Sequence, residues 1–202
     1  MSKVETRRAE LRDTLIALAE AQIERGGLAS LKARELAREA GCALGAIYNV
    51  FADMTALTMA VNGRTFARIG QQVGGAVTGH DSAPPERKLV LLAHAYLNFA
   101  ADNHHLWRAL FDLDLPDDAQ VPDWYRTELQ NLFRHIAIPV SQLFPSLTGR
   151  DLELMVRALF SSVHGMVLLG LQNRISGVPR ANIEAMIEAV LLRVANREQT
   201  VS

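Results

Sequence analysis

Apolar residues recur along most of this chain at the three- and four-residue spacing of amphipathic helices, and no segment shows the strict alternation typical of a β-strand. The first such segment covers residues 6–25, with arginine and glutamate on its opposite face. Its apolar positions are Leu11, Leu15, Leu18, Ala19 and Ile23. Gly26-Gly27 then ends the helix. The pattern therefore predicts an all-α protein.

Residues 30–51 predict two short helices joined by a tight turn. Ser30 is a suitable N-cap for the first helix, which we expect to span residues 30–40. Gly41 lies at the turn, where a left-handed backbone costs a residue with a Cβ atom about 1 kcal/mol or more. The inward positions are small or apolar: Leu36, Ala37, Ala40, Cys42, Ile47, Val50 and Phe51. This is the helix-turn-helix pattern, whose second helix enters the major groove of DNA.

The second helix, residues 44–50, presents a predicted DNA-facing surface with few polar groups. The positions expected to face DNA there are Ala43, Leu44, Gly45, Ala46, Tyr48 and Asn49. The hydrogen-bonding side chains among them are chiefly those of Tyr48 and Asn49. We therefore expect base discrimination to rest partly on contacts of Leu44 and Ala46 with thymine methyl groups.

Basic residues flank the helix pair. Lys32 and Arg34 fall in the first turn of the first helix, where a positive charge opposes the helix dipole, so we expect both to reach toward DNA phosphates. Arg8 belongs to an N-terminal basic cluster completed by Lys3, Arg7 and Arg12. Phosphate contact beside the reading helix is one interpretation of this cluster, and a solvated helix start is the other.

Beyond residue 52 the chain predicts one connecting helix and then a second group of helices. The connecting helix covers residues 53–77, and the stretch from Gly79 to Pro85 breaks the pattern, which places a boundary near residue 80. Later helices are expected at residues 86–101, 104–112, 122 onward, 151–174 and 182–197. Pro139 is expected to kink or end the third of these, and Leu115–Asp118 to form a loop. The predicted domains are 1–52, 53–80 and 81–202.

Residues 1–65 resemble the tetracycline-repressor (TetR) family of transcriptional regulators. The matching features are an amphipathic helix before the pair, the run Arg34-Glu-Leu-Ala followed by Ala40-Gly41, and the ending Gly45-Ala-Ile-Tyr48-Asn-Val-Phe51. The resemblance implies that Tyr48 touches a phosphate or a base. The chain departs from the family's pattern at Lys32 and Ala43, where Ser or Thr usually caps a helix, and at Met54, where a phosphate-contacting lysine is usual.

The resemblance also implies that the C-terminal half is a helical ligand-binding and dimerisation bundle. A further likeness, to a subset with a Trp-His-Gly signature, rests on Ser162-Val163-His164-Gly165, with valine in place of tryptophan. The last two long helices carry more apolar surface than one side of a bundle needs, so we expect them to pair with a second copy of the chain. A wholly internal core is the alternative. The expected dimer-interface residues are Phe160, Leu168, Ile183, Met186, Ile187, Val190, Leu191 and Val194.

Aromatic and histidine side chains of the second half could line a ligand pocket. The candidates are His94, Phe99, Trp107, Phe111, Trp124, Phe133 and His164. As a set they suit a small apolar or aromatic effector, although each residue, taken alone, fits a packed core better. Adjacent His104 and His105 point to different helix faces, so no metal site is expected. Cys42 is expected to pack in the core rather than to sense oxidants.

The composition changes this picture little. The chain has 202 residues, of which 49% are hydrophobic and 21% charged, enough for one long or two short domains with a real core. Its net charge of −1 argues against charge-driven coating of nucleic acid, and its single cysteine excludes an internal disulfide. The N-terminus is too charged for a signal peptide, and no apolar run approaches the ~20 residues of a membrane span. We therefore expect a soluble, cytoplasmic protein without membrane contact.

Catalytic motifs are missing from the sequence, which has no His-Glu-x-x-His, nucleophile elbow or phosphate-cradling glycine loop, so neither an enzyme nor a cofactor is expected. We predict a ligand-responsive transcriptional regulator, a repressor rather than an activator, that binds double-stranded DNA at a palindromic operator as a homodimer. The alternatives are a small helical ligand-binding protein or enzyme whose N-terminal motif is incidental, and a regulator whose bare reading helix binds another protein.

Overall fold

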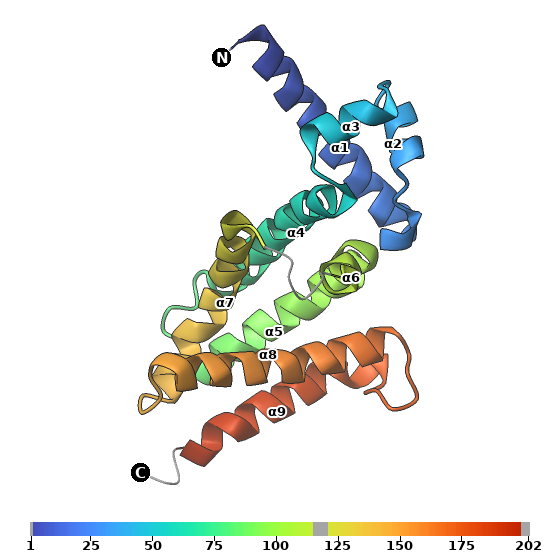
Figure 1. The fold of residues 1–202 in the computed structure, drawn as a ribbon. Coiled ribbons are helices and arrows are strands. Elements are labelled where there is room, and N and C mark those ends of the chain that lie inside the picture. Colours follow the sequence, from blue (N-terminus) through green and yellow to red (C-terminus); the bar gives the residue numbers. More distant parts are fainter. Residues whose placement is uncertain (1, 115–120, 199–202) are drawn as a thin grey trace. The chain divides into compact units, whose positions relative to one another are not determined.

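The computed structural model describes residues 2–114 and 121–198, and within these ranges it contains helices and no strand (Figure 1). The all-α fold expected from the apolar spacing is therefore confirmed for the described residues. The α-helices are α1 (Lys3–Gly26), α2 (Ala33–Glu39), α3 (Leu44–Val50), α4 (Met54–Val77), α5 (Pro85–Asp102), α6 (His104–Asp112), α7 (Asp123–Leu143), α8 (Gly149–Leu171) and α9 (Ile183–Glu198). Short 3-10 turns, Leu28–Ser30 and Arg180–Asn182, precede α2 and α9. The loop expected at Leu115–Asp118 lies outside the described residues.

The helices pack into two compact units. Unit 1 consists of Met1–Phe66 with Asn103–Arg126, and unit 2 consists of Ala67–Asp102 with Thr127–Ser202. Helices α4 and α7 each contribute their first part to unit 1 and their remainder to unit 2. This division by packing differs from the boundaries expected at residues 52 and 80, because α6 and the first turns of α4 share a core with the N-terminal helices.

One apolar core joins α1, α2, α3, α6 and the start of α4 within unit 1. Its buried members are Leu15, Ile16, Ala19, Ile23, Leu36, Ala37, Ile47, Phe51, Leu57, Ala60, Val61, Leu106 and Ala109. Fully burying a large apolar side chain of this kind stabilises a fold by about 1.5–3 kcal/mol. Helices of seven residues, such as α2 and α3, are too short to be stable alone, so this core is what holds them in place.

Glycines set the ends of the first helices as the sequence predicts. Helix α1 ends at Gly26, and the following Gly27 has a φ of 73°. Between α2 and α3, Gly41 has a φ of 64°, which is the left-handed conformation that glycine adopts without steric cost. The chain can therefore reverse sharply between the two short helices.

The first helix of the pair begins later than predicted. Helix α2 starts at Ala33 with Lys32 as its N-cap, so the expected start and cap at Ser30 are wrong. The hydroxyl of Ser30 instead lies 2.7 Å from the carbonyl oxygens of both Gln22 and Gly27. Because it is engaged with the end of α1, this hydroxyl does not cap α2.

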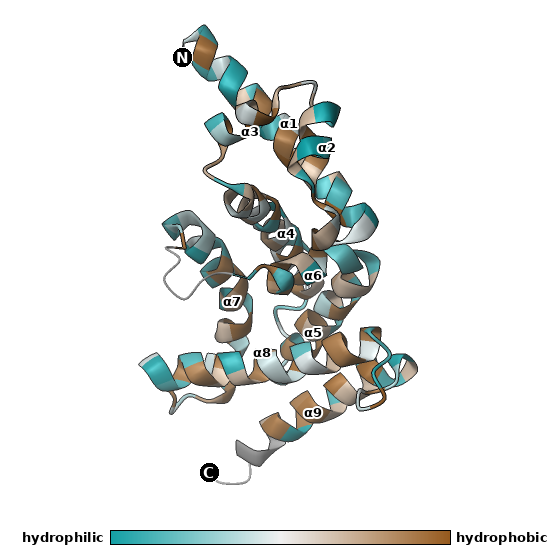
Figure 2. Cartoon of the chain, turned by 45° about the vertical axis from the view of Figure 1, so that its right-hand side comes forward, coloured by the Kyte–Doolittle hydropathy of each residue, from teal (hydrophilic) through white to brown (hydrophobic). Residues whose placement is uncertain are grey.

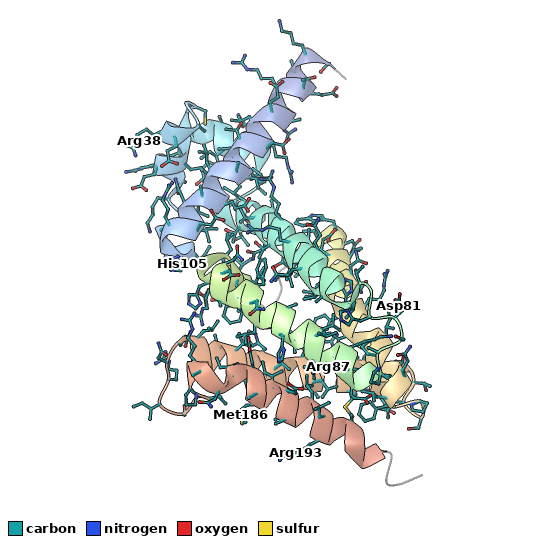
Figure 3. All side chains as sticks on the ribbon, turned by 180° about the vertical axis from the view of Figure 1, so that it is seen from behind. Arg38, Asp81, Arg87, His105, Met186 and Arg193 are labelled. Carbon is teal, nitrogen blue, oxygen red and sulfur yellow. The ribbon has the colours of Figure 1, made fainter. Side chains whose placement is uncertain are left out.

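Unit 2 is built on the mutual packing of α5, α8 and α9. A Cβ atom at Gly170 of α8 would lie 2.5 Å from Ile183 Cδ1, so the two helices approach closely there. Arg87 of α5, labelled in Figure 3, forms a 2.7 Å ion pair with Glu188 of α9. Helix α7 is not ended by Pro139, since it continues to Leu143.

Helix α8 is long and apolar enough, by length and composition, to cross a membrane, and so is the bent pair of α3 and α4 taken together. The expectation that no apolar segment reaches this length is therefore wrong for α8. Core helices of water-soluble proteins pass the same test. In α8 the residues Val156, Leu159, Val163 and Val167 are buried in unit 2. Hydrophobic segments run along α5, α8 and α9 in Figure 2, and only 28% of the apolar window of α8 is covered within the single chain.

Candidate functional site

Helix α3 presents the surface predicted to face DNA. Its inward residue Ile47 is fully buried, which fixes the rotation of the helix on the core of unit 1. On the opposite face Tyr48 is 48% exposed and Leu44 is 39% exposed, and Asn49 is also exposed. A Cβ atom at Gly45 would meet nothing within 4 Å, so this glycine opens the middle of the surface. Ala43 is exposed and Ala46 half-buried at the start of the helix.

The short helices lack the side-chain caps that are usual at helix starts. Lys32 and Ala43 are the N-cap residues of α2 and α3, and neither side chain makes a cap hydrogen bond. At α2 the backbone N–H of Lys32 donates to Oε1 of Gln22, at 3.4 Å. Gln22 belongs to α1, is 3% exposed, and is a residue that the apolar pattern did not reveal. The ammonium group of Lys32 is left to extend into solvent.

Exposed basic side chains occur on α1, at the start of α2 and along α2, the helices that pack with α3. Arg8, Lys32 and Arg34 are all exposed. Arg38, which the sequence analysis did not single out, is exposed at the end of α2 (Figure 3). The guanidinium of Arg12 lies 5.3 Å from the centre of the Phe51 ring, a cation–π contact that ties α1 to the end of α3. Positive charge is therefore available on α1 and α2 beside the reading helix.

In unit 2, four aromatic and histidine side chains form a connected cluster. The Phe160 ring stacks on His164 with centroids 5.5 Å apart, and Phe133 meets Phe160 edge-on at 5.1 Å. The hydroxyl of Tyr96 lies 2.9 Å from Nδ1 of His164, and its ring is 5.8 Å from that of Phe160. Of these, Phe133 and His164 belong to the predicted ligand residues and Phe160 to the predicted interface residues, whereas Tyr96 belongs to neither set.

Two further predicted ligand residues of unit 2 have other partners. Nε2 of His94 lies 3.2 Å from the carbonyl oxygen of Glu184 in α9. Phe99 is 2% exposed, and the guanidinium of Arg68 lies 5.7 Å from its ring centre. These contacts are those of helix packing.

The remaining predicted ligand residues, Trp107, Phe111 and Trp124, lie in unit 1. Trp107 is fully buried and meets the half-exposed Phe111 edge-on, with centroids 5.6 Å apart. Trp124 stands at the start of α7, where its ring packs over Gly63 of α4. The predicted ligand set is therefore divided between the two units rather than gathered in one cluster.

Unit 1 contains a buried polar group that the hydrophobic pattern does not predict. Asn62 of α4 is fully buried, and its amide nitrogen donates to the carbonyl of Ala109 at 3.2 Å and to the hydroxyl of Tyr125 at 3.4 Å. Burial raises the pKa of Tyr125 above its usual value of 10.0, and the hydrogen bond from Asn62 partly opposes this shift. A hydrophobic pattern does not reveal such a group, because one polar residue on an apolar stripe looks like a surface position.

The residues predicted for a dimer interface fall into two classes. Ile183, Ile187 and Leu191 are at most 3% exposed and belong to the core of unit 2, so they are corrected from interface to core. Phe160, Leu168 and Val194 are half-buried, whereas Met186 and Val190 are exposed. Helix α8 adds two exposed leucines that the sequence analysis did not select, Leu154 and Leu169.

Cys42 and the paired histidines have ordinary structural surroundings. Cys42 is half-buried at the edge of the unit 1 core, against which it packs. Nδ1 of His105 lies 2.8 Å from the carbonyl oxygen of Glu24, and the ring of His104 lies 6.0 Å from that of Trp107.

Family models match both halves of the chain. The model described as bacterial regulatory proteins, tetR family, matches residues 15–61. The model described as tetracyclin repressor-like, C-terminal domain, matches residues 89–194. No protein of curated function is similar enough in sequence to match the chain.

Solved structures share the fold over nearly the whole chain. A protein with unknown function from Rhodococcus sp. RHA1 is 24% identical with a TM-score of 0.71, covering 91% of this chain and 94% of that one. RolR in complex with resorcinol is 18% identical with a TM-score of 0.67, covering 98% and 95%. The transcriptional regulator FadR from Bacillus subtilis in complex with stearoyl-CoA is 16% identical with a TM-score of 0.65, covering 88% and 94%.

Proposed function

The chain belongs to the tetR family of bacterial regulatory proteins, and on that premise we propose that it represses transcription as a homodimer bound to a palindromic DNA operator. Membership makes it a transcriptional regulator with a DNA-binding helix-turn-helix and a ligand-binding C-terminal domain. The observation that carries the proposal is α3, which buries Ile47 and exposes Tyr48 and Leu44. A DNA-binding protein of this kind acts in the cytoplasm.

DNA binding would combine phosphate contacts with a sparse reading surface. Lys32, Arg34 and Arg8 are exposed beside α3 and would contact phosphates, which position the protein without reading sequence. Tyr48 and Asn49 would donate or accept hydrogen bonds, and the exposed Leu44 would contact thymine methyl groups. Two copies of α3 would enter successive major grooves, about 34–36 Å apart.

A second copy of the chain would supply the other reading helix. One face of α8 carries small, mostly exposed residues, Ala158, Ser161 and Gly165, between exposed Leu154 and Leu169. Small residues allow two helices to approach closely, and the leucines supply apolar area. Met186 and Val190 of α9 are also exposed and would extend this apolar surface. Such a self-complementary surface fits a two-fold homodimer, in which both copies use the same face.

The effector of this regulator would be a small apolar or aromatic molecule. RolR and FadR, which share the fold, bind resorcinol and stearoyl-CoA, respectively. In unit 2, His164 and Tyr96 bring polar groups to the rings of Phe160 and Phe133, the mixture of aromatic area and a few polar atoms that ligand sites use. The effector would release DNA only as far as it binds a non-binding conformer more tightly.

The experiment that tests this function is operator binding by the full chain. A gel shift against the upstream region of its own gene should give a retarded band at low salt. Tyr48→Ala should weaken binding about tenfold or more, because it removes a base or phosphate contact. Lys32→Ala should weaken binding and lower the slope of log affinity against log salt by about 2, because a homodimer loses two phosphate contacts.

Arg150→Ala is the matched control, since it removes an exposed positive charge from the first turn of α8 in unit 2. It should leave both affinity and salt slope unchanged. Absence of any retarded band at low salt, or equal loss of affinity in Arg150→Ala and Lys32→Ala, would count against specific DNA binding through α2 and α3.

A further inference from the structure

Asn62 occupies an unusual place in the interior of unit 1. It lies in the middle of α4 and is fully buried. Its side-chain nitrogen donates to Ala109 of α6 and to Tyr125 of α7, so that one amide links three helices. The Ala109 carbonyl only accepts hydrogen bonds, which fixes the nitrogen of the amide on that side and the oxygen on the other.

The amide oxygen of Asn62 has no hydrogen-bond donor among the described residues. The two buried threonines of α4 bond within their own helix, since the hydroxyl of Thr58 donates to the carbonyl of Met54 and that of Thr65 to the carbonyl of Val61. A buried acceptor without a donor costs free energy, and native proteins rarely leave one without a water, an ion or a ligand. A hydrogen-bond donor from outside the chain would therefore satisfy the amide oxygen of Asn62.

Tyr125, which shares the hydrogen bond of Asn62, lies among aromatic rings. The ring of Tyr125 meets Phe66 edge-on at 5.3 Å and Trp124 edge-on at 5.5 Å. A Cβ atom at Gly63 would lie 2.9 Å from the Trp124 ring, which is 45% exposed and borders on solvent. Burial raises the pKa of Tyr125, so its hydroxyl stays neutral at physiological pH. A water molecule bonds best to two or more polar partners, whereas an aromatic molecule needs only one here.

We propose that Asn62 is the polar anchor of a binding site in unit 1 for a small neutral aromatic molecule that carries a hydroxyl group, such as a phenol. The hydroxyl donates to the Asn62 amide oxygen, and the ring packs among Phe66, Trp124 and Tyr125. Entry requires the ring of Trp124 to move from Gly63. A cation would be a poorer ligand, because the polar groups of the site are a neutral amide and a neutral phenol, and burial of an unpaired charge is costly.

This site would act on DNA binding directly, and in that respect the inference rests on the proposed function. Val61, the neighbour of Asn62 in α4, packs in the same core as Ile47 of the reading helix. A ligand that shifts α4 at Asn62 therefore shifts a wall of the core on which α3 is seated. The site is distinct from the Tyr96–His164 cluster, which belongs to unit 2.

The test compares phenol with anisole, which has the same ring but a methyl ether in place of the hydroxyl. Isothermal titration calorimetry and thermal unfolding of the full chain should show phenol binding at least about tenfold more tightly than anisole, the effect of one hydrogen bond. Asn62→Leu should abolish this difference. Thr65→Val is the matched control, since it changes a buried α4 residue whose hydroxyl is already bonded within its own helix.

Equal affinity for phenol and anisole, or binding of neither at millimolar concentration, would overturn the inference, and so would a difference that persists in Asn62→Leu. Equal affinity of the unaltered chain overturns the inference even if Asn62→Leu fails to fold, and His164→Ala shows whether the unit 2 cluster contributes to any difference. A gel shift on the same sample separates the two claims. Operator binding without phenol discrimination removes the site but keeps the regulator, and the reverse result removes the regulator but keeps the site.

Discussion

Two glycines of the helix-turn-helix play opposite parts, although an added Cβ atom would meet nothing within 4 Å at either. Gly41 has a φ of 64°, so Gly41→Ala should lower the free energy of unfolding by about 1 kcal/mol through backbone strain alone. Gly45 lies within α3 with a helical backbone, so Gly45→Ala should raise it by about 0.5–1 kcal/mol. Urea unfolding of the two variants checks the signs, and a change in the same direction for both would contradict this account.

Because of Tyr125, the free energy of unfolding should fall as pH rises in the alkaline range. Burial raises its pKa in the folded state above the usual 10.0. The unfolded chain therefore loses this proton first, so the contribution to stability is complete below pH 10 and is lost as pH rises through the folded pKa. Tyr125→Phe should flatten the decline of the urea midpoint between pH 9 and pH 11, whereas Tyr48→Phe, on an exposed residue, should not. An equal effect of both substitutions would show that burial of Tyr125 is not the cause.

Single residues were predictable where the hydrophobic pattern alone decides their place. Ile47 and Phe51 are buried as the spacing predicts, and Gly41 adopts the left-handed conformation that its position in the turn requires. Asn62 and Gln22 were not predictable, because a buried polar residue is defined by partners that are distant in sequence. The partner of Asn62, Tyr125, is 63 residues away.

At the scale of elements, the sequence predicted the existence of the helices better than their ends. The start of α2 was misplaced because the Ser30 hydroxyl, a good cap by composition, is engaged by carbonyls of Gln22 and Gly27. Pro139 was expected either to kink α7 or to end it, and it lies inside a helix that continues to Leu143. Local propensity limits where a helix can begin and end, and tertiary contacts decide where it does so.

The buried face of a helix was harder to predict than its ends. In α9 a single stripe of apolar residues was expected to form an interface, but Ile183, Ile187 and Leu191 fill the core of unit 2, and Met186 and Val190 are left on the surface. Likewise α6, expected among the ligand-binding helices, supplies Leu106 and Ala109 to the core beneath the reading helix. Periodicity shows that a helix is amphipathic, but it does not show which helix or which second chain covers the apolar face.

At the scale of the whole molecule, a regulator that reads two half-sites needs a stable second copy. Helices α8 and α9 carry four exposed large apolar residues, Leu154, Leu169, Met186 and Val190, while Leu129, Ile138 and Ile175 are exposed elsewhere in unit 2. Less than a third of the apolar window of α8 is buried within one chain. An apolar surface of this kind is costly to leave in water, and monomeric proteins rarely keep a large one without a binding role. Dimer formation and operator affinity should therefore fall together when this surface is altered.

Val190→Glu tests that link. A carboxylate buried without a partner at a dimer interface should raise the dimer dissociation constant about a hundredfold or more, and the variant should lose operator affinity because two half-sites are no longer read jointly. Ala185→Glu is the control, since it adds the same charge to an exposed position on the side of α9 away from Met186 and Val190. Sedimentation equilibrium should find a monomer for Val190→Glu and an unchanged dimer for Ala185→Glu. A Val190→Glu protein that remains dimeric and binds its operator would place the interface elsewhere on the chain.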